Sequence, residues 1–273
     1  MVLIVSVFLN NGHASQESFL EGTPFPKVHS PTPSHDYKTL PEGFEESVSF
    51  SGAGHYVHFH LGVARYLQET YDLSKVCFLG SSSGSLPATL LAADVSIQDA
   101  TEKWLTEAYS TCATKTTGVY FNFAEVMTST FLKYLPSDSH EKASNRAIIT
   151  LTKAWGLRSK RIAHFTSNQN LLKALIASCH WPYIINKQMF SYFNDEVYLD
   201  GGLTDFWPKV DVNTVLVSPY MWSFIWRKAW LLNGMYFTTD SKRNLRLYED
   251  GYKHAAENPE HWLRLEKFRK KTP

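Results

Sequence analysis

Gly80-Ser81-Ser82-Ser83-Gly84 is the segment of this chain whose residue types and spacing best suit covalent chemistry. It fits the pattern G-x-S-x-G and lies between a predicted strand (residues 75–79) and a predicted helix (residues 83–93). There the middle serine, Ser82, occupies a tight turn with its hydroxyl exposed, and Gly80 and Gly84 leave room for the backbone. The helix that follows adds free N–H groups. We therefore predict Ser82 as a nucleophile, the alternative being a plain Ser- and Gly-rich loop.

A second short motif, Ser51-Gly52-Ala53-Gly54, also lies between a predicted strand (residues 47–51) and a predicted helix (residues 55–69). Glycines at such a turn let backbone N–H groups approach a negative charge without interference from a Cβ atom. Alone the motif is weak, because many strand-to-helix turns need glycine. Together with the serine turn it predicts an oxyanion hole formed by the N–H groups of Gly52, Ala53 and Gly54.

Asp200-Gly201-Gly202 follows a short predicted strand at residues 196–199. As an isolated feature it is typical of a D-G turn. The functional interpretation is that the strand end presents the Asp200 carboxylate to the Ser82 hydroxyl as a general base, with Gly201 and Gly202 allowing an unusual backbone. A carboxylate, with an ordinary pKa of about 4, is a weaker base than imidazole, so this chemistry depends on positioning and a dry site.

The elements around these motifs alternate between strand and helix, which predicts an α/β fold. A hairpin is expected over residues 189–193 and 196–199, turned by Asn194 and Asp195. The other expected elements are strands at residues 161–166 and 212–218 and helices at residues 168–178, 221–232, 241–257 and 260–271.

The sequence suggests three parts. Residues 1–43 form a leader and Pro-rich linker, because five of the twelve prolines fall within eighteen residues there. Residues 44–258 form the predicted hydrolase domain, and residues 259–273 a basic C-terminal helix or tail. Residues 2–9 are apolar but follow no Lys or Arg, so we interpret them as a buried or interfacial start, or a truncated start, with a weak secretion signal as the alternative.

Taken together, the motifs resemble the patatin-like phospholipase domain, in particular the animal-type branch of acylglycerol lipases and phospholipases. The resemblance runs from Phe44 to about Glu257. The matching segments are Phe50-Ser51-Gly52-Ala53-Gly54, Phe59-His60-Leu61-Gly62-Val63, Gly80 to Leu86, Ala177-Ser178-Cys179 with Pro182, Tyr198 to Leu203, Val217-Ser218-Pro219 and, more loosely, Tyr248 to Ala256.

The resemblance implies a three-layer α/β/α sandwich with a mostly parallel central sheet and a Ser–Asp dyad. It also implies a serine acyl hydrolase that cleaves fatty-acyl esters of glycerolipids or phospholipids through an acyl-enzyme on Ser82, with Asp200 as base and no metal or other cofactor. The chain departs from the family pattern at Ala53, which stands between two glycines, and at His55, which follows them. Ala53 keeps its N–H group. Segments such as residues 113–139 would set selectivity.

Two alternatives remain open at this stage. A late histidine, His254, gives the chain order of an α/β-hydrolase triad, Ser82-Asp200-His254. The other alternative is a catalytically idle patatin fold that binds lipid or regulates a partner. A metal site formed by His55, His58 and His60 is not expected, because one helix cannot bring all three together.

Composition limits the partners. With 27 basic and 26 acidic residues the formal net charge is +1, which gives no general basis for nucleic-acid binding. Trp222, Trp226 and Trp230 recur every four residues, as in either a core-facing stripe or an interfacial anchor. We expect a cytoplasmic protein attached peripherally to membranes or lipid droplets.

Overall fold

The computed structural model describes residues 37–220 and 236–271. The chain divides into two compact units, Met1–Pro33 and Ser34–Pro273, and the description concerns the second. Most of the expected leader and the helix expected over residues 221–232, with its three tryptophans, therefore lie outside the described residues.

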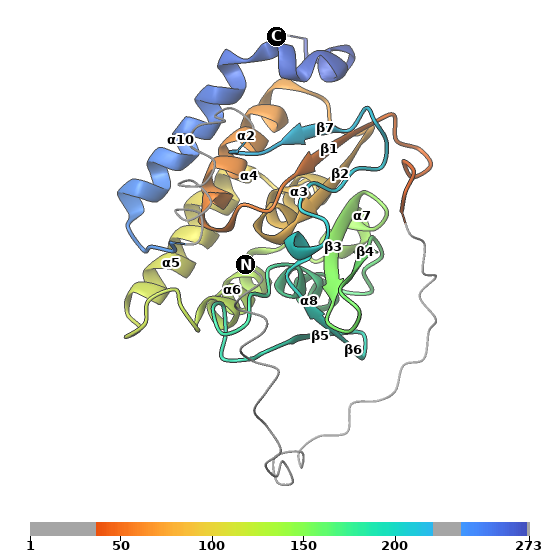
Figure 1. Ribbon diagram of the computed structural model, residues 1–273. Coiled ribbons are helices and arrows are strands. Elements are labelled where there is room, and N and C mark those ends of the chain that lie inside the picture. Colours follow the sequence, from red (N-terminus) through yellow and green to blue (C-terminus); the bar gives the residue numbers. More distant parts are fainter. Residues whose placement is uncertain (1–36, 221–235, 272–273) are drawn as a thin grey trace. The chain divides into compact units, whose positions relative to one another are not determined.

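A mixed sheet organises this unit. Within the described residues it has seven strands, and hydrogen-bonded neighbours follow the path β5-β6-β3-β2-β1-β7 (Figure 1). Strands β2 and β6 pair with successive parts of one edge of β3, and β4 pairs with its other edge. The neighbours from β7 to β3 are parallel, while β4 and β6 pair with β3, and β5 with β6, in the antiparallel sense. This confirms the expected fold class, a central sheet flanked by helices. The strands are β1 (Glu46–Phe50), β2 (Val76–Ser81), β3 (Ala147–Lys153), β4 (Arg158–Ile162), β5 (Ser191–Phe193), β6 (Glu196–Leu199) and β7 (Val215–Val217).

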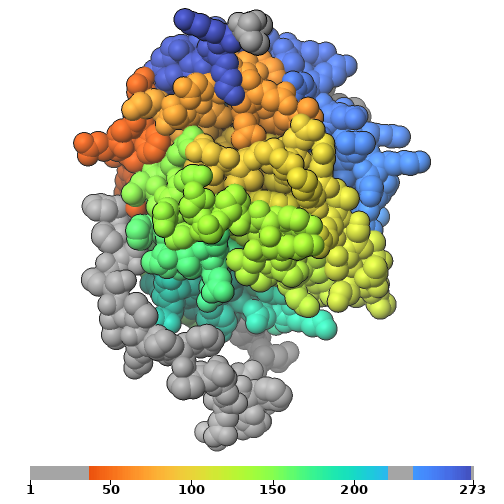
Figure 2. All heavy atoms as spheres, turned by 180° about the vertical axis from the view of Figure 1, so that it is seen from behind, coloured from red at the N-terminus to blue at the C-terminus, as the bar shows by residue number. Residues whose placement is uncertain are grey.

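Helices connect and cover the strands. Seen from behind, the part of the chain that contains α5, α6 and α7, yellow to green, forms the middle of the surface, with α10 in blue along one side (Figure 2). The α-helices are α2 (Val57–Thr70), α3 (Ser85–Ala92), α4 (Ile97–Asp99), α5 (Thr106–Ala113), α6 (Phe123–Tyr134), α7 (Ser139–Ala143), α8 (Asn168–Ser178) and α10 (Ser241–Glu257). Short 3₁₀ segments are η1 (Gly54–Tyr56), η2 (Ser82–Gly84), η4 (Gly201–Leu203) and η5 (Pro259–Phe268), and η3 (Ala100–Leu105) is a π-helix.

The two faces of the sheet have different cores. Successive side chains of a strand point to opposite faces, so β2 contributes Phe78 to one core and Leu79 to the other. Phe78 belongs to the larger cluster, which includes side chains of α2, α3 and α8. Leu79 belongs to a smaller cluster with Ile148 and Val210, against which Phe44 packs. Both faces are therefore buried, as expected for parallel strands.

Helix α10 lies directly on α2 because each helix has a glycine at the crossing. A Cβ atom on Gly62 would stand 1.9 Å from the carbonyl oxygen of Tyr248, and one on Gly251 would stand 2.1 Å from that of Phe59. The backbones thus meet with no side chain between them. Helix α2 follows the Gly52–Gly54 loop, so this crossing also holds the helix behind that loop.

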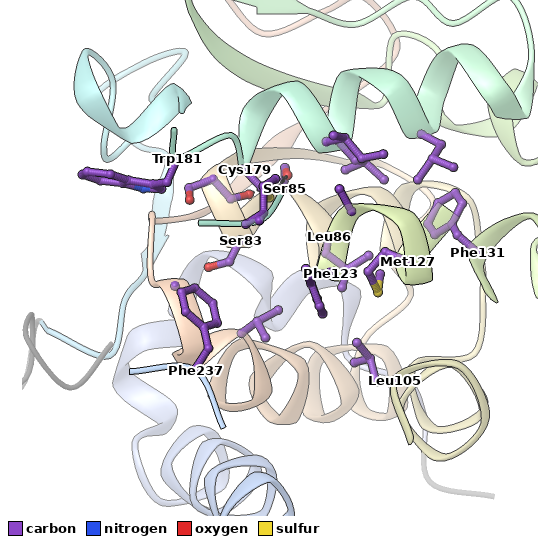
Figure 3. A pocket seen from close by; sticks show the side chains of 18 of the residues that line it. Ser83, Ser85, Leu86, Leu105, Phe123, Met127, Phe131, Cys179, Trp181 and Phe237 are labelled. Atoms are coloured by element: carbon purple, nitrogen blue, oxygen red, sulfur yellow. Dashed lines mark hydrogen bonds between the residues drawn. The ribbon is translucent and has the colours of Figure 1, made fainter. Parts of the chain in front are cut away.

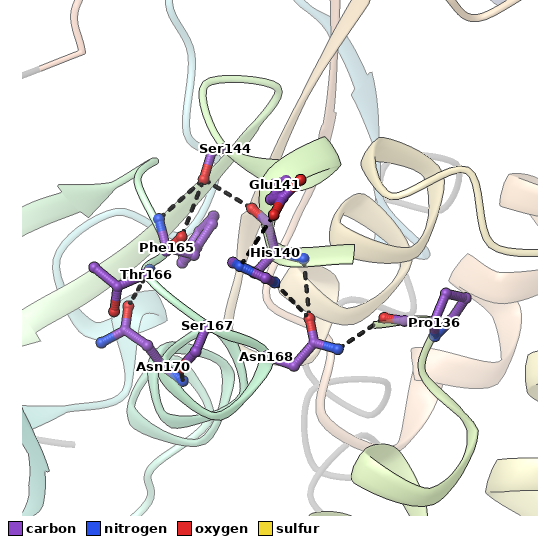
Figure 4. A network of polar contacts seen from close by, with 9 residues as sticks. All are labelled: Pro136, His140, Glu141, Ser144, Phe165, Thr166, Ser167, Asn168 and Asn170. Carbon is purple, nitrogen blue, oxygen red and sulfur yellow. Dashed lines mark hydrogen bonds and ion pairs between the residues drawn. The ribbon is translucent and has the colours of Figure 1, made fainter. Parts of the chain in front are cut away.

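A polar network joins the end of α6 to the start of α8 (Figure 4). Asn168 donates from Nδ2 to the carbonyl oxygen of Pro136 at 2.7 Å and accepts from the backbone N–H of His140 at 3.0 Å. Ser144 donates to the carbonyl oxygen of His140 at 2.8 Å and accepts from the N–H of Phe165 at 3.0 Å. These bonds fix the separation of α6 and α8, two helices that flank the pocket described below.

Residues 259–271, within the segment for which the sequence predicts a basic C-terminal helix or tail, pack against the rest of the fold. Trp262 is fully buried and donates from Nε1 to the carbonyl oxygen of Ala255 at 2.8 Å. Arg264 and Lys267 pair with the buried carboxylate of Glu46 on β1 at 2.8 and 3.0 Å. Two of the basic residues of the segment therefore neutralise a buried acid, and its regular part is a 3₁₀ helix rather than an α-helix.

Several expected elements are confirmed and others need correction. The helices expected at residues 168–178 and 241–257 and the hairpin turned by Asn194 and Asp195, both with positive φ, are present. The strand expected at residues 161–166 is instead Arg158–Ile162, and the one expected at residues 212–218 is shortened to Val215–Val217. Strand β3, at the centre of the sheet, was not predicted at all.

Candidate active site

Ser82 lies on a sharp turn between β2 and α3. Its φ of 52° is in the left-handed region, which non-glycine residues rarely adopt. A Cβ atom on Gly80 would stand 2.4 Å from Cα of Ser85, and one on Gly84 would stand 2.3 Å from the carbonyl oxygen of Ser51. The two glycines are therefore required by close backbone approaches on either side of Ser82, as the G-x-S-x-G pattern predicts.

The sheet register brings Ser82 and Asp200 together. Strand β2 runs parallel to β3 and ends where Ser81 pairs with Thr150, whereas β6 runs antiparallel to β3 and ends where Leu199 pairs with Thr152. Strand β4 pairs with these same β3 residues, so β2 and β6 share the opposite edge of β3. Their carboxyl ends point toward each other along this edge. The residues that follow them, Ser82 and Asp200, therefore meet.

The two side chains form a short, buried hydrogen bond. Ser82 donates from Oγ to Oδ2 of Asp200 at 2.6 Å, and Oδ1 accepts from the N–H of Gly202 at 2.8 Å. Asp200 is 1% exposed and Ser82 6%. Burial raises the pKa of Asp200 to about 7, although the hydrogen bonds from Ser82 and Gly202 act in the opposite direction. Such a carboxylate is a much stronger base than an exposed one.

Gly201 and Gly202 allow the Asp200-Gly201-Gly202 segment to lie directly against neighbouring atoms. A Cβ atom on Gly201 would stand 2.1 Å from the carbonyl oxygen of Thr150, and one on Gly202 would stand 3.0 Å from Oδ1 of Asp200. The Asp200 backbone is held from both sides: its N–H donates to the carbonyl oxygen of His180 at 2.8 Å, and its carbonyl oxygen accepts from Oγ1 of Thr152 at 2.8 Å.

Ser178 is a supporting residue to which sequence reasoning gave no role. Its hydroxyl accepts from the N–H of Ser82 at 3.0 Å and donates to the carbonyl oxygen of Thr150 at 2.8 Å. It thus ties the strained turn to the central strand. The signal for it was present, since Ala177-Ser178-Cys179 was among the segments that resemble the family.

The Gly52–Gly54 loop lies next to this site, but its three N–H groups are not equivalent. The N–H of Gly52 donates to the carbonyl oxygen of Phe206 at 3.0 Å, so this group is not free for the predicted oxyanion hole. Within the described part of the chain, the N–H groups of Ala53 and Gly54 have no acceptor. Gly54 has a φ of 56° and lines the same pocket as Ser82. Of the three N–H groups predicted to form an oxyanion hole, the structure therefore leaves two available, those of Ala53 and Gly54.

A largely apolar pocket of about 790 Å³, its open part included, leads away from Ser82. Figure 3 shows Ser83, Trp181 and Phe237 at one end and Phe131, Met127 and Leu105 toward the other. Its walls come from α2, α3, η3, α5, α6 and α8 and from the loop after α8. The aliphatic and sulfur-bearing lining residues are Val57, Leu86, Leu105, Ala124, Met127, Leu172, Leu175, Ile176, Cys179 and Ile185.

The side chains of His254, His55, His58 and His60 take no part in the contact between Ser82 and Asp200. The direct 2.6 Å contact between Ser82 and Asp200 leaves no place for an imidazole between them, so the Ser82-Asp200-His254 triad is wrong. The His254 ring lies 5.8 Å from that of Phe59 on α2. Burial lowers the pKa of His55 to about 4 and those of His58 and His60 to about 3, so all three are neutral near pH 7. Among the described residues no cluster of His, Cys, Asp and Glu could hold a metal.

Comparisons with known proteins agree with this fold. The family model described as patatin-like phospholipase matches residues 48–208, which include Ser82, Asp200 and the Gly52–Gly54 loop. The chain therefore belongs to the patatin-like phospholipase family. Among solved structures, VipD from Legionella pneumophila aligns with a TM-score of 0.53 at 12% sequence identity, over 82% of this chain and 67% of that chain, which is a likeness of fold.

Relatives come from the animal branch. Human patatin-like phospholipase domain-containing protein 2 is 32% identical over 181 residues, which are 64% of this chain and 36% of that protein. Human patatin-like phospholipase domain-containing protein 4 is 31% identical, over 64% of this chain and 71% of that protein. Human 1-acylglycerol-3-phosphate O-acyltransferase PNPLA3 is 27% identical, over 64% and 37%. The match thus spans little more than a third of the first of these proteins.

One further finding concerns membranes. Over residues 37–220 and 236–271, no helix combines the length and the apolar character that crossing a bilayer requires.

Proposed function

We propose that the protein is a serine acyl hydrolase that cleaves fatty-acyl esters of glycerolipids or phospholipids. The observation that carries this proposal is the 2.6 Å hydrogen bond between Ser82 and the buried Asp200, formed beside an apolar pocket. Burial of an ionisable acid such as Asp200 destabilises the fold. A base whose pKa lies near 7 is, however, suited to activating a serine hydroxyl at neutral pH.

The reaction follows from this geometry. Oδ2 of Asp200 takes the Ser82 hydroxyl proton as Oγ attacks the ester carbonyl carbon, and the N–H groups of Ala53 and Gly54 stabilise the oxyanion that forms. The protonated Asp200 then gives its proton to the leaving alcohol oxygen, and an acyl-enzyme remains on Ser82. In the second half Asp200 removes a proton from water as the water oxygen attacks the acyl carbon. The bond between that carbon and Ser82 Oγ then breaks, Oγ takes the proton back from Asp200, and the fatty acid is released.

The pocket supports a fatty-acyl substrate. Its apolar walls on α6 and α8 offer a long chain burial without polar partners, and about 0.8 kcal/mol per buried CH₂ is available from that burial. Residues 113–139, expected to set selectivity, contribute α6 with Phe123, Met127 and Phe131 to the lining.

Hydrolysis of emulsified acylglycerols and phospholipids tests the proposal, with mass spectrometry to find an acyl group on Ser82. We expect Ser82→Ala to lower activity by at least about 10³-fold, and Asp200→Asn by a similar factor, because the two act as a unit. Matched controls are Ser110→Ala on α5 and Asp250→Asn on α10, both at exposed positions. A Ser82→Ala protein that is folded and retains activity would disprove the mechanism.

The name of one relative describes acyl transfer to an alcohol. The same acyl-enzyme would support that reaction if an alcohol displaced water in the second half. Product analysis with a monoacylglycerol added as acceptor separates the two, and we expect free fatty acid as the main product.

A further inference from the structure

The hairpin between β3 and β4 ends in two exposed apolar side chains. Trp155 is 74% exposed and Leu157 is 56% exposed. Large apolar residues at the tip of a hairpin contribute little to the core of this chain, because most of their surface remains in water. Their presence needs another explanation.

Leu157 also has an unfavourable backbone conformation. Leu157 has a φ of 44°, in the left-handed region, and follows Gly156 at 82°. Glycine or asparagine adopts this conformation with less strain than a leucine. The fold alone would therefore favour a different residue at position 157, and the side chain that is present is both strained and exposed.

Two aromatic residues extend this apolar tip. The rings of Trp155 and Phe190 are 5.8 Å apart, and Tyr192, two residues further on in β5, is 66% exposed. The neighbouring hairpin is joined through the N–H of Ala154, which donates to the carbonyl oxygen of Val197 at 2.9 Å. Figure 1 shows the ends of β3, β5 and β6 close together. We call Trp155, Leu157, Phe190 and Tyr192 the hairpin patch.

The β3–β4 hairpin is positively charged. Its two strands and their turn, residues 147–162, contain four cationic side chains and no acidic one, whereas the neighbouring β5–β6 hairpin contributes Asp195 and Glu196. Lys153 pairs with Glu196 at 2.6 Å, and Arg161 with Asp205 at 2.8 Å. Within the described parts of the chain Arg158 and Lys160 form no close ion pair, although the charge of Lys160 contributes to lowering the pKa of Glu196. Exposed Trp and Tyr flanked by cations are typical of a surface that meets anionic lipid headgroups.

A single loop connects the hairpin patch to the pocket that holds Ser82. Phe190 ends the loop that begins after α8, and Trp181 and Ile185 of that loop line the pocket. Figure 3 shows Trp181 at the same end of the pocket as Ser83. A lipid layer in contact with Trp155 and Phe190 would therefore adjoin the loop that borders the reacting end of the pocket.

We propose that the hairpin patch inserts into the surface of a lipid layer that carries anionic headgroups, with Arg158 and Lys160 binding those headgroups. The inference rests on the proposed function only in that it places the substrate in such a layer. It concerns how the protein reaches its substrate and uses none of the residues that carry out the reaction.

Flotation with vesicles tests insertion. The protein is mixed with vesicles of phosphatidylcholine and phosphatidylserine, and Trp155→Ser and Leu157→Asn are compared with Leu263→Ser, a 70% exposed leucine on η5. We expect each hairpin variant to lower the bound fraction by at least about tenfold and the control to leave it unchanged. Leu157→Asn should also melt at the same or a higher temperature, so that lost binding cannot be ascribed to unfolding.

Two further arms separate this proposal from the proposed function. Arg158→Gln with Lys160→Gln should weaken binding to the mixed vesicles and not to vesicles of phosphatidylcholine alone, whereas Lys242→Gln with Arg246→Gln on α10 should change neither. Binding should persist in Ser82→Ala even if no hydrolysis is found. Wild-type protein that fails to float with the mixed vesicles, or hairpin variants that bind as well as wild type, would overturn the inference.

Discussion

Replacing Asp200 by asparagine should make the protein more stable at neutral pH while removing its activity. The asparagine side chain keeps the shape of the aspartate and an acceptor for the N–H of Gly202, but it carries no charge. Burial raises the pKa of Asp200 from 3.8 to about 7 in the folded protein. The folded state therefore binds a proton more tightly than the unfolded state, and ionisation of Asp200 opposes folding.

The size of the stability difference, and the pH range in which it appears, follow from the pKa shift of Asp200. Below about pH 4 the carboxyl is protonated in the folded and the unfolded state and does not change the free energy of unfolding. As the pH rises from about 4 to about 7 the folded state retains the proton that the unfolded state has lost, so stability falls; above about pH 7 the loss is complete. Three pKa units at about 1.4 kcal/mol each give about 4 kcal/mol. The advantage of Asp200→Asn over wild type should grow by this order between pH 4 and pH 8.

Urea unfolding followed by circular dichroism, at several pH values between 4 and 8, measures this difference. Asp250→Asn on α10 is the matched control, since this side chain is exposed, and its difference from wild type should vary little with pH. If the difference between Asp200→Asn and wild type stays constant across this range, Asp200 does not have a raised pKa and the argument for a strong base is refuted.

Other predictions follow from the same contacts. The kcat/KM for a soluble ester should rise with pH around a midpoint near 7, because Asp200 must be ionised to act; a flat profile from pH 5 to 9 would contradict this. Ser178→Ala should lower kcat by about tenfold with little change in KM, since the N–H of Ser82 loses its acceptor; an unchanged kcat would count against its positioning role. Gly251→Ala should destabilise the fold by at least about 2 kcal/mol in thermal melts while the exposed Glu249→Ala does not. Phe131→Leu should raise the kcat/KM for long acyl esters relative to that for short ones by about twofold to tenfold. An unchanged ratio would mean that the acyl chain of the substrate does not reach Phe131.

The motifs of the candidate site can be recognised in the sequence because they are local and have strict backbone requirements. The G-x-S-x-G turn and the DGG segment are needed where a Cβ atom would strike neighbouring backbone, as at Gly84 and Gly201. The Asn194-Asp195 turn is similarly local, since both residues tolerate the positive φ that it needs.

What the sequence did not predict depends on distant partners. The N–H of Gly52 is engaged by Phe206, more than 150 residues later, and no local pattern reports this. Strand β3 is buried along almost its whole length, so its apolar run lacks the alternation that distinguishes a strand from a buried helix. Strand β4 carries Arg158 and Lys160 and is partly exposed, which moved its predicted position toward the more apolar residues that follow.

The central claim is that Ser82 is activated by Asp200 alone, and labelling by a fluorophosphonate tests it most directly, because the probe needs an activated serine and no particular lipid. The purified wild-type chain should label. Ser82→Ala and Asp200→Asn should not, and His254→Gln should label as wild type does. Labelling that survives in folded Ser82→Ala or is lost in folded His254→Gln, or a folded wild-type chain that never labels, would contradict the account.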